Sequence, residues 1–366
     1  MDENGNSDVT KALLELLVDR YKIKYGSTDI NTITKRISQY PITPQEAILQ
    51  TNNTMFPVSD LNERLNQLDN NPSEYDDVYV GELVQRDGKV EFNPTGDIPI
   101  RDFPTKDNKL QGALEIFAMP QKDPNGNVFP ERYIIGLDPI DNDQANTMSF
   151  GSMFVLDLWT DTIAAEYTGR PSFANDLYEL VRKTCLFYNA KCLYENNLHG
   201  IFSYFSQHNC TYLLADTPEY LKERELIKTI GSGNTSKGVR AGTSVIKYAL
   251  KLIRDWLMKP VSKIEHDAEG NEVVTSMPNL YKLRNRALIK EMILWNPNIN
   301  VDRIMAMVQV MLYREEKMIL YQGDLQGGKN KTFSSGLEDD PFFTNNYRFS
   351  NDMKTPAWVN RTYRMN

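Results

Sequence analysis

The sequence predicts an α/β protein in which helices cover the faces of a mixed β-sheet. Three apolar segments follow one another closely, "ERYIIGLDP", "SFGSMFVLDLW" and "TIAAEYT", which is typical of antiparallel strands in a meander. Helical and strand-like patterns then alternate in "SFANDLYELVRKTCLFYNA", "KCLYEN", "LHGIFSYFSQHN" and "TYLLA". A meander followed by alternating helix and strand builds a mixed sheet with helices packed on it.

The composition is that of a globular chain. Its 366 residues leave room for a sizeable core, and 40% apolar with 10% aromatic residues excludes a disordered chain. No apolar run approaches the roughly 20 residues that span a bilayer, and the N-terminus lacks the pattern of a signal peptide. We therefore expect a soluble, cytoplasmic protein without a membrane partner.

Charge and cysteine content exclude two further classes. A net charge of −8 argues against a protein that coats nucleic acid with its whole surface, although it permits a local basic groove. Three cysteines without CxxC spacing indicate neither a disulfide framework nor a thiolate zinc site.

The sequence divides into four regions, of which the first two precede the meander. Residues 1–58 are predicted to be helical, because Asp8 is placed to cap one helix and Thr43 and Glu46 have the spacing of a capping box. Residues 59–129 are rich in Asp, Asn, Pro and Gly around short strand-like pieces, which indicates a linker that merges into a small β region.

The other two regions follow. Residues 130–320 contain the meander, the alternating elements, a glycine- and serine-rich loop, a long amphipathic helix, a hairpin turned near Glu269 to Asn271, and two more helices. Residues 321–366, rich in Gly, Asn, Asp and Phe, are predicted to form a C-terminal tail.

The loop after the first strand of the meander carries three aspartates. In "YIIGLDPIDNDQANT", Asp138 ends the apolar run, and Asp141 and Asp143 follow it. A polar turn before Pro139 and a metal site both fit this pattern. A calcium loop does not fit, because counting from Asp138 or from Asp141 leaves a serine where the twelfth-position glutamate is required.

Two further acids could meet Asp138 in the fold. Glu195 closes the strand-like "KCLYEN", and the ends of parallel strands in one sheet lie at the same edge. A helix-cap region around Asn196 or Asn197 is the alternative interpretation. Asp302 begins the apolar helix "NVDRIMAMVQVML", where it either favours the helix dipole or, if this helix packs beside the first strand, completes a triad.

Three carboxylates of this kind suit magnesium or manganese. Two such ions held ~4 Å apart activate a water molecule and stabilise the leaving oxygen in phosphodiester hydrolysis. The histidines lack the spacing of a zinc site.

These segments together resemble a known family, the ribonuclease H-like nucleases, and specifically the C-terminal nuclease domain of tailed-phage terminase large subunits. The matching pieces are "YIIGLDP", "CLYENN", "SKGVRAGTSVIKYALKLIRDWL" and "NVDRIMAMVQVMLYREE". Upstream, "YPITPQEAILQTNNTMFP" resembles the segment that closes the ATPase domain in that family. The resemblance covers most of residues 35–320 and rests on their order, since no single motif would suffice.

The resemblance implies a ribonuclease H-like fold and a function. Asp138, Glu195 and Asp302 would be the catalytic metal ligands, with Asp141 or Asp143 as an auxiliary acid, and the cofactor would be two magnesium or manganese ions. Family members cut double-stranded DNA concatemers during genome packaging, together with a portal and a small terminase subunit. The expected location is the cytoplasm of an infected bacterial host, with transient association at the procapsid.

One departure from the family concerns ATP. The full-length family carries an N-terminal ATPase with a P-loop, and nothing before residue 35 matches one. "GDLQGGKN", Gly323 to Asn330, has Asn330 where Ser or Thr should hold magnesium, and it opens no helix. We therefore expect no ATP site in this chain, and an ATPase encoded separately or in a longer product.

A basic segment predicts the DNA contacts. Lys237, Arg240, Lys247 and Lys251 belong to a stretch with a single acid, Asp255, which is either a solvated helix face or a phosphate-binding surface. Since no recognition-helix or zinc-finger signature is present, we expect cleavage that depends little on base sequence.

Two other functions stay open at this stage. The chain could be a catalytically inactive assembly protein of the packaging motor, with its carboxylates kept as structural residues. It could also be another ribonuclease H-like nuclease such as a junction resolvase, although the segment from Tyr40 to Pro57 favours a terminase.

Overall fold

The structure is a computed structural model of the whole chain. It describes residues 8–26, 32–43, 46, 55–105, 110–140, 149–197, 199–228, 236–266, 272–296 and 299–325. No helix in these ranges is both long enough and apolar enough to cross a bilayer.

The centre of the sheet is the meander that the sequence predicts. Its antiparallel strands are β4 (Tyr133–Asp138), β5 (Gly151–Asp157) and β6 (Thr162–Gly169). After them the chain returns through a helix, and β7 (Lys191–Tyr194) pairs with β4 in parallel. The predicted order of three antiparallel strands followed by a parallel one is therefore confirmed.

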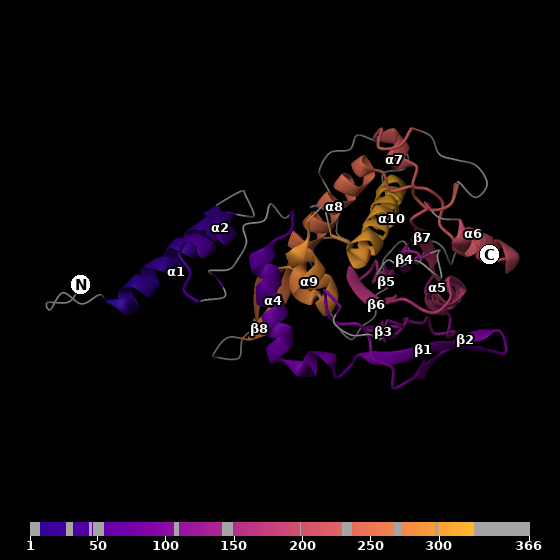
Figure 1. Cartoon of the computed structure of the whole chain (residues 1–366), viewed down its shortest axis with the longest axis horizontal. Helices are drawn as coiled ribbons and strands as arrows, with labels where there is room; N and C mark the ends of the chain where they lie inside the picture. The colour runs from indigo at the N-terminus through magenta and orange to yellow at the C-terminus, as the bar shows by residue number, and fades with distance from the viewer. Residues whose placement is uncertain are drawn as a thin grey trace.

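The short strands upstream extend this same sheet. They are β1 (Tyr79–Arg86), β2 (Lys89–Pro94) and β3 (Leu114–Ile116), and β3 pairs with β6, which gives the order β2-β1-β3-β6-β5-β4-β7. The segment predicted as a small β region therefore continues the main sheet (Figure 1).

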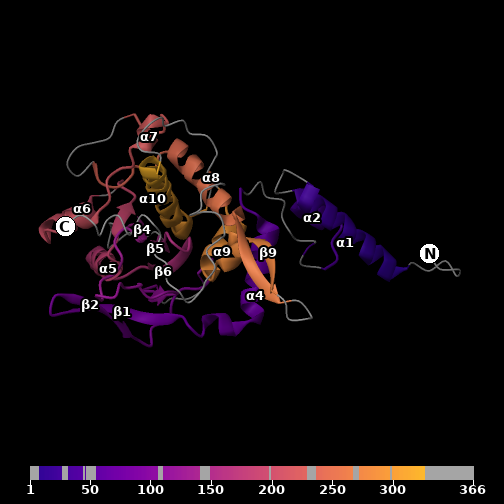
Figure 2. The ribbon, with the colours of Figure 1, turned by 180° about the vertical axis from the view of Figure 1, so that it is seen from behind.

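Helices cover both faces of the sheet. One face carries α5 (Ala174–Tyr188) and α6 (Gly200–Gln207), and the other carries α8 (Thr243–Met258), α9 (Arg286–Leu294) and α10 (Asp302–Leu325) (Figures 1 and 2). Each face of the sheet packs against its helices in a separate hydrophobic core, and alternate side chains of β4 point into one core or the other. Ile135 and Leu137 pack with α5 and α6, whereas Ile134 packs with α8 and α10. This is a ribonuclease H-like α/β architecture.

Gly136 lets α10 lie directly on β4. A Cβ atom built on Gly136 would lie 2.4 Å from the backbone nitrogen of Val310 and 2.7 Å from the carbonyl oxygen of Ala306. Only a residue without a side chain permits this approach, which brings the first turn of α10 to the end of the sheet where β4 ends.

The N-terminal helices stand apart from the sheet. They are α1 (Val9–Gly26) and α2 (Thr32–Gln39), which lie to one side of the molecule (Figure 1). Asp8 caps α1 by accepting a 2.9 Å hydrogen bond from the Lys11 amide, as predicted. Lys24 of α1 forms a 2.9 Å ion pair with Asp60 of α4 (Val58–Asn70).

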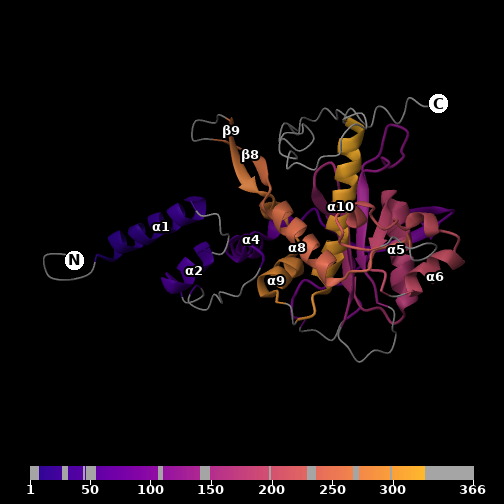
Figure 3. The same ribbon diagram turned by 90° about the horizontal axis from the view of Figure 1, so that it is seen from above.

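The remaining elements include one departure from prediction. The hairpin is present as β8 (Pro260–His266) and β9 (Glu272–Pro278), which project beyond α8 (Figure 3), and its predicted turn lies outside the described residues.

"TYLLA" is not a strand: Thr211–Leu213 form a 3-10 turn, and only Leu214 bridges to Cys192. The other short helices are η1 (Pro72–Tyr75), α7 (Tyr220–Glu223) and η4 (Asn279–Lys282).

Candidate functional site

Asp138 and Glu195 meet at one edge of the sheet. Leu137 of β4 lies in register with Tyr194 of β7, so the two acids that follow are neighbours at the carboxyl ends of parallel strands. The Glu195 amide donates a 3.1 Å hydrogen bond to the carbonyl oxygen of Leu137, which fixes this alignment. The carboxyl groups themselves share a hydrogen bond.

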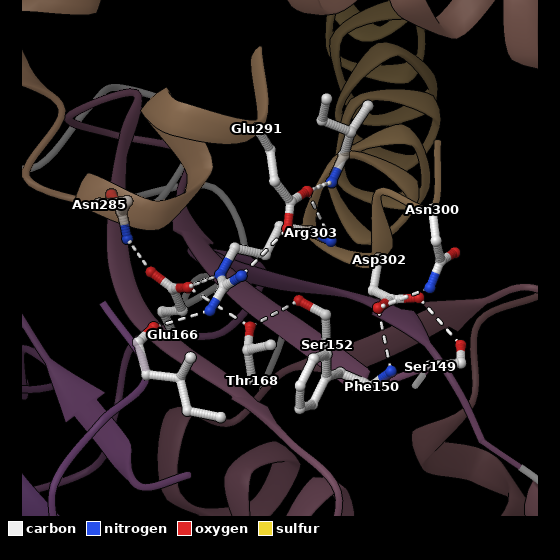
Figure 4. A network of polar contacts seen from close by, with 12 residues as sticks. Ser149, Phe150, Ser152, Glu166, Thr168, Asn285, Glu291, Asn300, Asp302 and Arg303 are labelled. Carbon is white, nitrogen blue, oxygen red and sulfur yellow. Dashed lines mark hydrogen bonds and ion pairs between the residues drawn. The ribbon is translucent and has the colours of Figure 1, made fainter. Parts of the chain in front are cut away.

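Asp302 approaches the pair from the first turn of α10. Its side chain is only 6% exposed and accepts hydrogen bonds from three donors in the loop before β5 and the turn before α10. These donors are the Ser149 hydroxyl at 3.0 Å, the Phe150 amide at 2.9 Å and the Asn300 side-chain amide at 3.1 Å (Figure 4). Asp302 is close enough to Asp138 for its charge to act on that carboxyl group.

The three carboxyl groups resist carrying negative charge together. Burial raises the pKa of Asp138 well above its usual range, and the charges of Glu195 and Asp302 raise it further. Burial also raises the pKa of Glu195, although the hydrogen bond from Asp138 opposes this effect. For Asp302, burial raises the pKa while the hydrogen bonds from Phe150 and Ser149 work against it. Such a cluster is stabilised by a bound proton or a bound cation.

The donor chemistry of these side chains fits a hard divalent cation, because carboxylate oxygens are the ligands that magnesium and manganese prefer. In the described ranges, however, no three His, Cys, Asp or Glu side chains form a group that could hold a metal ion. The structure therefore shows a carboxyl pair, Asp138 and Glu195, with Asp302 beside it. Asp141 and Asp143 lie outside the described residues.

A buried ionic network adjoins Asp302. The Arg303 guanidinium, 1% exposed, bonds to Glu166 of β6 and to Glu291 of α9, each at 3.0 Å (Figure 4). Burial raises the pKa of Glu291 to about 7 even though Arg303 opposes this shift. The sequence pattern gave no prediction for these residues, although both Glu291 and Arg303 are charged residues followed directly by apolar runs, "MILW" and "IMAM".

The predicted basic residues differ in their surroundings, and the segment that carries Lys237 and Arg240 lies beside Glu195. Val239 bridges to Glu195, and the Asn196 amide donates a 2.9 Å hydrogen bond to the Val239 carbonyl oxygen. Lys237 is half-buried and forms a 2.8 Å ion pair with Asp216. The side chains exposed to solvent are those of Arg240, Lys247 and Lys251.

The glycine-rich segment near the C-terminus begins inside a helix. Gly323 to Leu325 belong to the end of α10, and residues 326–330 lie outside the described ranges. A phosphate-binding loop has the opposite arrangement, since it precedes the helix whose N-terminus faces the phosphates.

Comparisons with known proteins gave likenesses to solved structures and no match by sequence. No family model and no curated protein matches the chain. Crystal structures of the large terminase nuclease from thermophilic phage G20c, one of them with bound magnesium, align at 12% and 13% identity, each with a TM-score of 0.25. The alignments cover 65% of this chain and 94% of that nuclease. A TM-score this low establishes neither a shared family nor a shared function.

Proposed function

We propose that this chain is the nuclease portion of a phage terminase large subunit, a divalent-metal-dependent endonuclease that cleaves double-stranded DNA during genome packaging. The observation that carries the proposal is the hydrogen bond between the Asp138 and Glu195 carboxyl groups at the ends of two parallel strands, with Asp302 beside them. Buried acids that raise one another's pKa are a common mark of a catalytic or metal-binding site.

Each carboxylate has its own part in this proposal. Asp138 and Glu195 would contact the cation directly, and Asp302 would contribute from α10, where Phe150 and Ser149 hold its carboxylate. Two bound magnesium or manganese ions would supply an activated water molecule and stabilisation of the leaving oxygen. Asp141 and Asp143 follow Asp138 closely enough in the chain to serve as auxiliary acids.

The predicted basic residues would bind the DNA backbone. Arg240, Lys247 and Lys251 are exposed and therefore available to phosphates. Lys237 has to leave Asp216 before it can contact a phosphate, so we expect it to contribute less. Contacts of this kind carry little base specificity.

The cellular setting follows from the same proposal. The enzyme would act in the cytoplasm of an infected bacterial host and transiently at the procapsid. Its partners would be a portal, a small terminase subunit and an ATPase domain or subunit that drives translocation.

The direct test is cleavage of a supercoiled plasmid in the presence of magnesium. Wild-type protein should cut it, and Asp138→Asn should reduce cutting by at least about a hundredfold, because a ligand and its charge are lost while the shape is kept. Circular dichroism should show an unchanged fold. Undiminished cutting by Asp138→Asn would contradict the assignment of the site.

Two accompanying measurements separate the rival functions. Calorimetry with manganese should detect binding that depends on Asp138 and Glu195, whereas an inactive assembly protein without a working site should show none. A four-way junction compared with a linear duplex should be cut no faster by a terminase nuclease, while strong preference for the junction would indicate a resolvase.

A further inference from the structure

Helix α10 begins without a cap from its own sequence. The Val301 carbonyl oxygen accepts the first helical hydrogen bond, from Met305 at 3.0 Å, but a valine side chain offers no acceptor for the free amides of the first turn. Glu291 of the neighbouring helix α9 supplies the acceptor. Its Oε2 atom accepts hydrogen bonds from the amides of Arg303 and Ile304, each at 3.1 Å.

Because Glu291 caps α10, the Asp302 carboxylate is not needed as the cap of its own helix. An aspartate in the first turn of a helix is well suited to pair with the free amides there. Here its carboxylate points away from Glu291 and accepts hydrogen bonds from the Phe150 amide and the Ser149 hydroxyl (Figure 4). Since Glu291 already satisfies the amides of the helix start, Asp302 does not have to turn back toward them.

The second oxygen of Glu291 ties the helix start to the sheet. Glu291 Oε1 accepts a 3.0 Å hydrogen bond from Arg303 Nη1, and Arg303 Nε donates to Glu166 of β6, also at 3.0 Å. Glu166 in turn accepts a hydrogen bond from Thr168, whose hydroxyl lies 2.9 Å from that of Ser152.

Ser152 is the residue opposite Asp138 in the β4–β5 register. A continuous series of buried polar contacts thus joins the turn that carries Asp302 to Ser152 of β5, the strand that pairs with β4.

We infer that Glu291 is a positioning residue of this site. It caps α10 and clamps Arg303 so that the Asp302 carboxylate stays on the side of the helix that faces Asp138 and Glu195. The inference rests on the proposed function for its catalytic meaning, but its structural content is testable without catalysis.

Amide hydrogen exchange at Phe150 is the primary readout, because that amide donates to Asp302 and reports its position with no metal present. In Glu291→Ala the Phe150 amide should exchange about tenfold faster, while amides in the centre of the β4–β5 pair keep their rates. Glu291→Gln keeps an oxygen that can cap α10, so it should restore most of the protection. Unchanged Phe150 exchange in Glu291→Ala would overturn the inference, whatever the wild-type protein does to DNA.

Asp157→Asn is the matched control. Asp157 is buried at the opposite end of β5 and forms a 2.7 Å ion pair with Arg132, so its replacement also breaks a buried ion pair, but far from the first turn of α10. This variant should lose stability and leave the Phe150 amide protected. If both variants accelerate exchange at Phe150 equally, general destabilisation explains the effect and Glu291 has no specific role.

Metal binding and kinetics then connect the inference to the site. In Glu291→Ala, manganese affinity should fall by about tenfold and kcat with it, while KM for DNA changes by less than about twofold, because groups that orient ligands act on the metal and not on DNA binding. Asp157→Asn should keep the wild-type manganese affinity. If wild-type protein neither binds manganese nor cuts DNA, the proposed function fails, and the Phe150 result still decides the positioning role.

Discussion

Asp138 and Glu195 share a hydrogen bond between their carboxyl groups at the ends of two parallel strands. Burial and the charge of Glu195 both raise the pKa of Asp138, because two neighbouring carboxylates in a buried place oppose each other's ionisation when no cation compensates them. We therefore expect the protonation of this pair to affect the stability of the protein and, under the proposed function, the binding of a cation.

The first prediction concerns stability. Because the folded-state pKa of Asp138 is raised, the favourable contribution of this group is complete below the unfolded-state value of about 3.9 and is lost as the pH rises through the folded-state pKa. Asp138→Asn mimics the protonated form and should raise the free energy of unfolding by about 1 kcal/mol at pH 7 without metal. Urea unfolding at pH 7 and pH 4 should show the gain shrinking at the lower pH.

Glu91→Gln provides the control for this comparison, because Glu91 is exposed on the edge strand β2. Its free energy of unfolding should stay within about 0.5 kcal/mol of wild type at both pH values. A destabilised Asp138→Asn variant at pH 7 would mean that the carboxyl pair is not electrostatically strained.

The second prediction concerns the pH dependence of cation binding. Because the pKa of Asp138 is raised, a cation that binds this pair has to compete with protons, so manganese affinity should rise by up to about tenfold per pH unit below that pKa. Calorimetry in two buffers of different ionisation enthalpy should detect release of close to one proton. Affinity that is independent of pH between 5 and 8 would exclude this pair as the binding site.

The third prediction concerns Asp161, which joins the turn after β5 to two helices. It accepts 2.7 Å hydrogen bonds from Arg314 and forms a 3.0 Å ion pair with Lys259. Burial alone would raise the pKa of Asp161, but Arg314 and Lys259 outweigh it and hold that pKa below its usual range. Asp161→Asn should therefore lower the free energy of unfolding by about 3 kcal/mol at pH 7.

The sign of the pH effect is opposite to that of Asp138. The stabilisation from a lowered pKa is complete above the unfolded-state value of about 3.9 and is lost as the pH falls through the folded-state pKa. The difference between wild type and Asp161→Asn should shrink on acidification below about pH 4. Asparagine also tolerates the positive φ of 55° at this position, so the variant isolates the charge from backbone strain.

The fourth prediction concerns Gly136. Gly136→Ala places a methyl group against the backbone of Val310 and Ala306, so α10 has to move off β4. We expect a loss of about 3 kcal/mol in the free energy of unfolding. Gly96→Ala is the control, because a Cβ atom there meets nothing within 4 Å. Equal stability of the two variants would show that the close approach of α10 is not required.

The fifth prediction concerns DNA binding. Replacing Lys247 and Lys251 by alanine should weaken binding to duplexes of any sequence and lower the slope of log affinity against log salt by about one per lysine in contact with a phosphate. Lys89→Ala, on the exposed edge strand β2, should leave both quantities unchanged. Fluorescence anisotropy over a salt series measures them, and an unaltered slope in the double variant would place the DNA elsewhere.

The sequence predicted the parts of the fold that depend on local patterns and short connections. Apolar runs joined by short loops indicated β4, β5 and β6, and an amphipathic helix between two strands indicated the parallel partner β7. That topology brings the ends of β4 and β7 together, which is why the meeting of Asp138 and Glu195 could be foreseen.

The sequence could not predict features that depend on distant partners. The pairing of β3 with β6 joins segments separated by the whole of β4 and β5, and no local pattern specifies it. The network of Glu166, Glu291 and Arg303 brings residues from three elements into one buried site. The ion pair between Lys237 and Asp216 likewise requires two segments 21 positions apart in the chain to lie side by side. A charged residue beside an apolar run indicates that it has polar partners in the fold, but it does not identify them.

Because α10 is a long helix, the close contact at Gly136 restricts its movement along its own axis. The helix has 24 residues and thus spans about 36 Å as one rigid rod from Asp302 to Leu325. A rod of this kind transmits displacement along its axis, so a slide along β4 by a single residue's rise of about 1.5 Å would draw Asp302 out of reach of the Phe150 amide. The close contact of Gly136 with Val310 and Ala306, in the first half of the helix, opposes such a slide and so limits how far Asp302 can move along the helix axis.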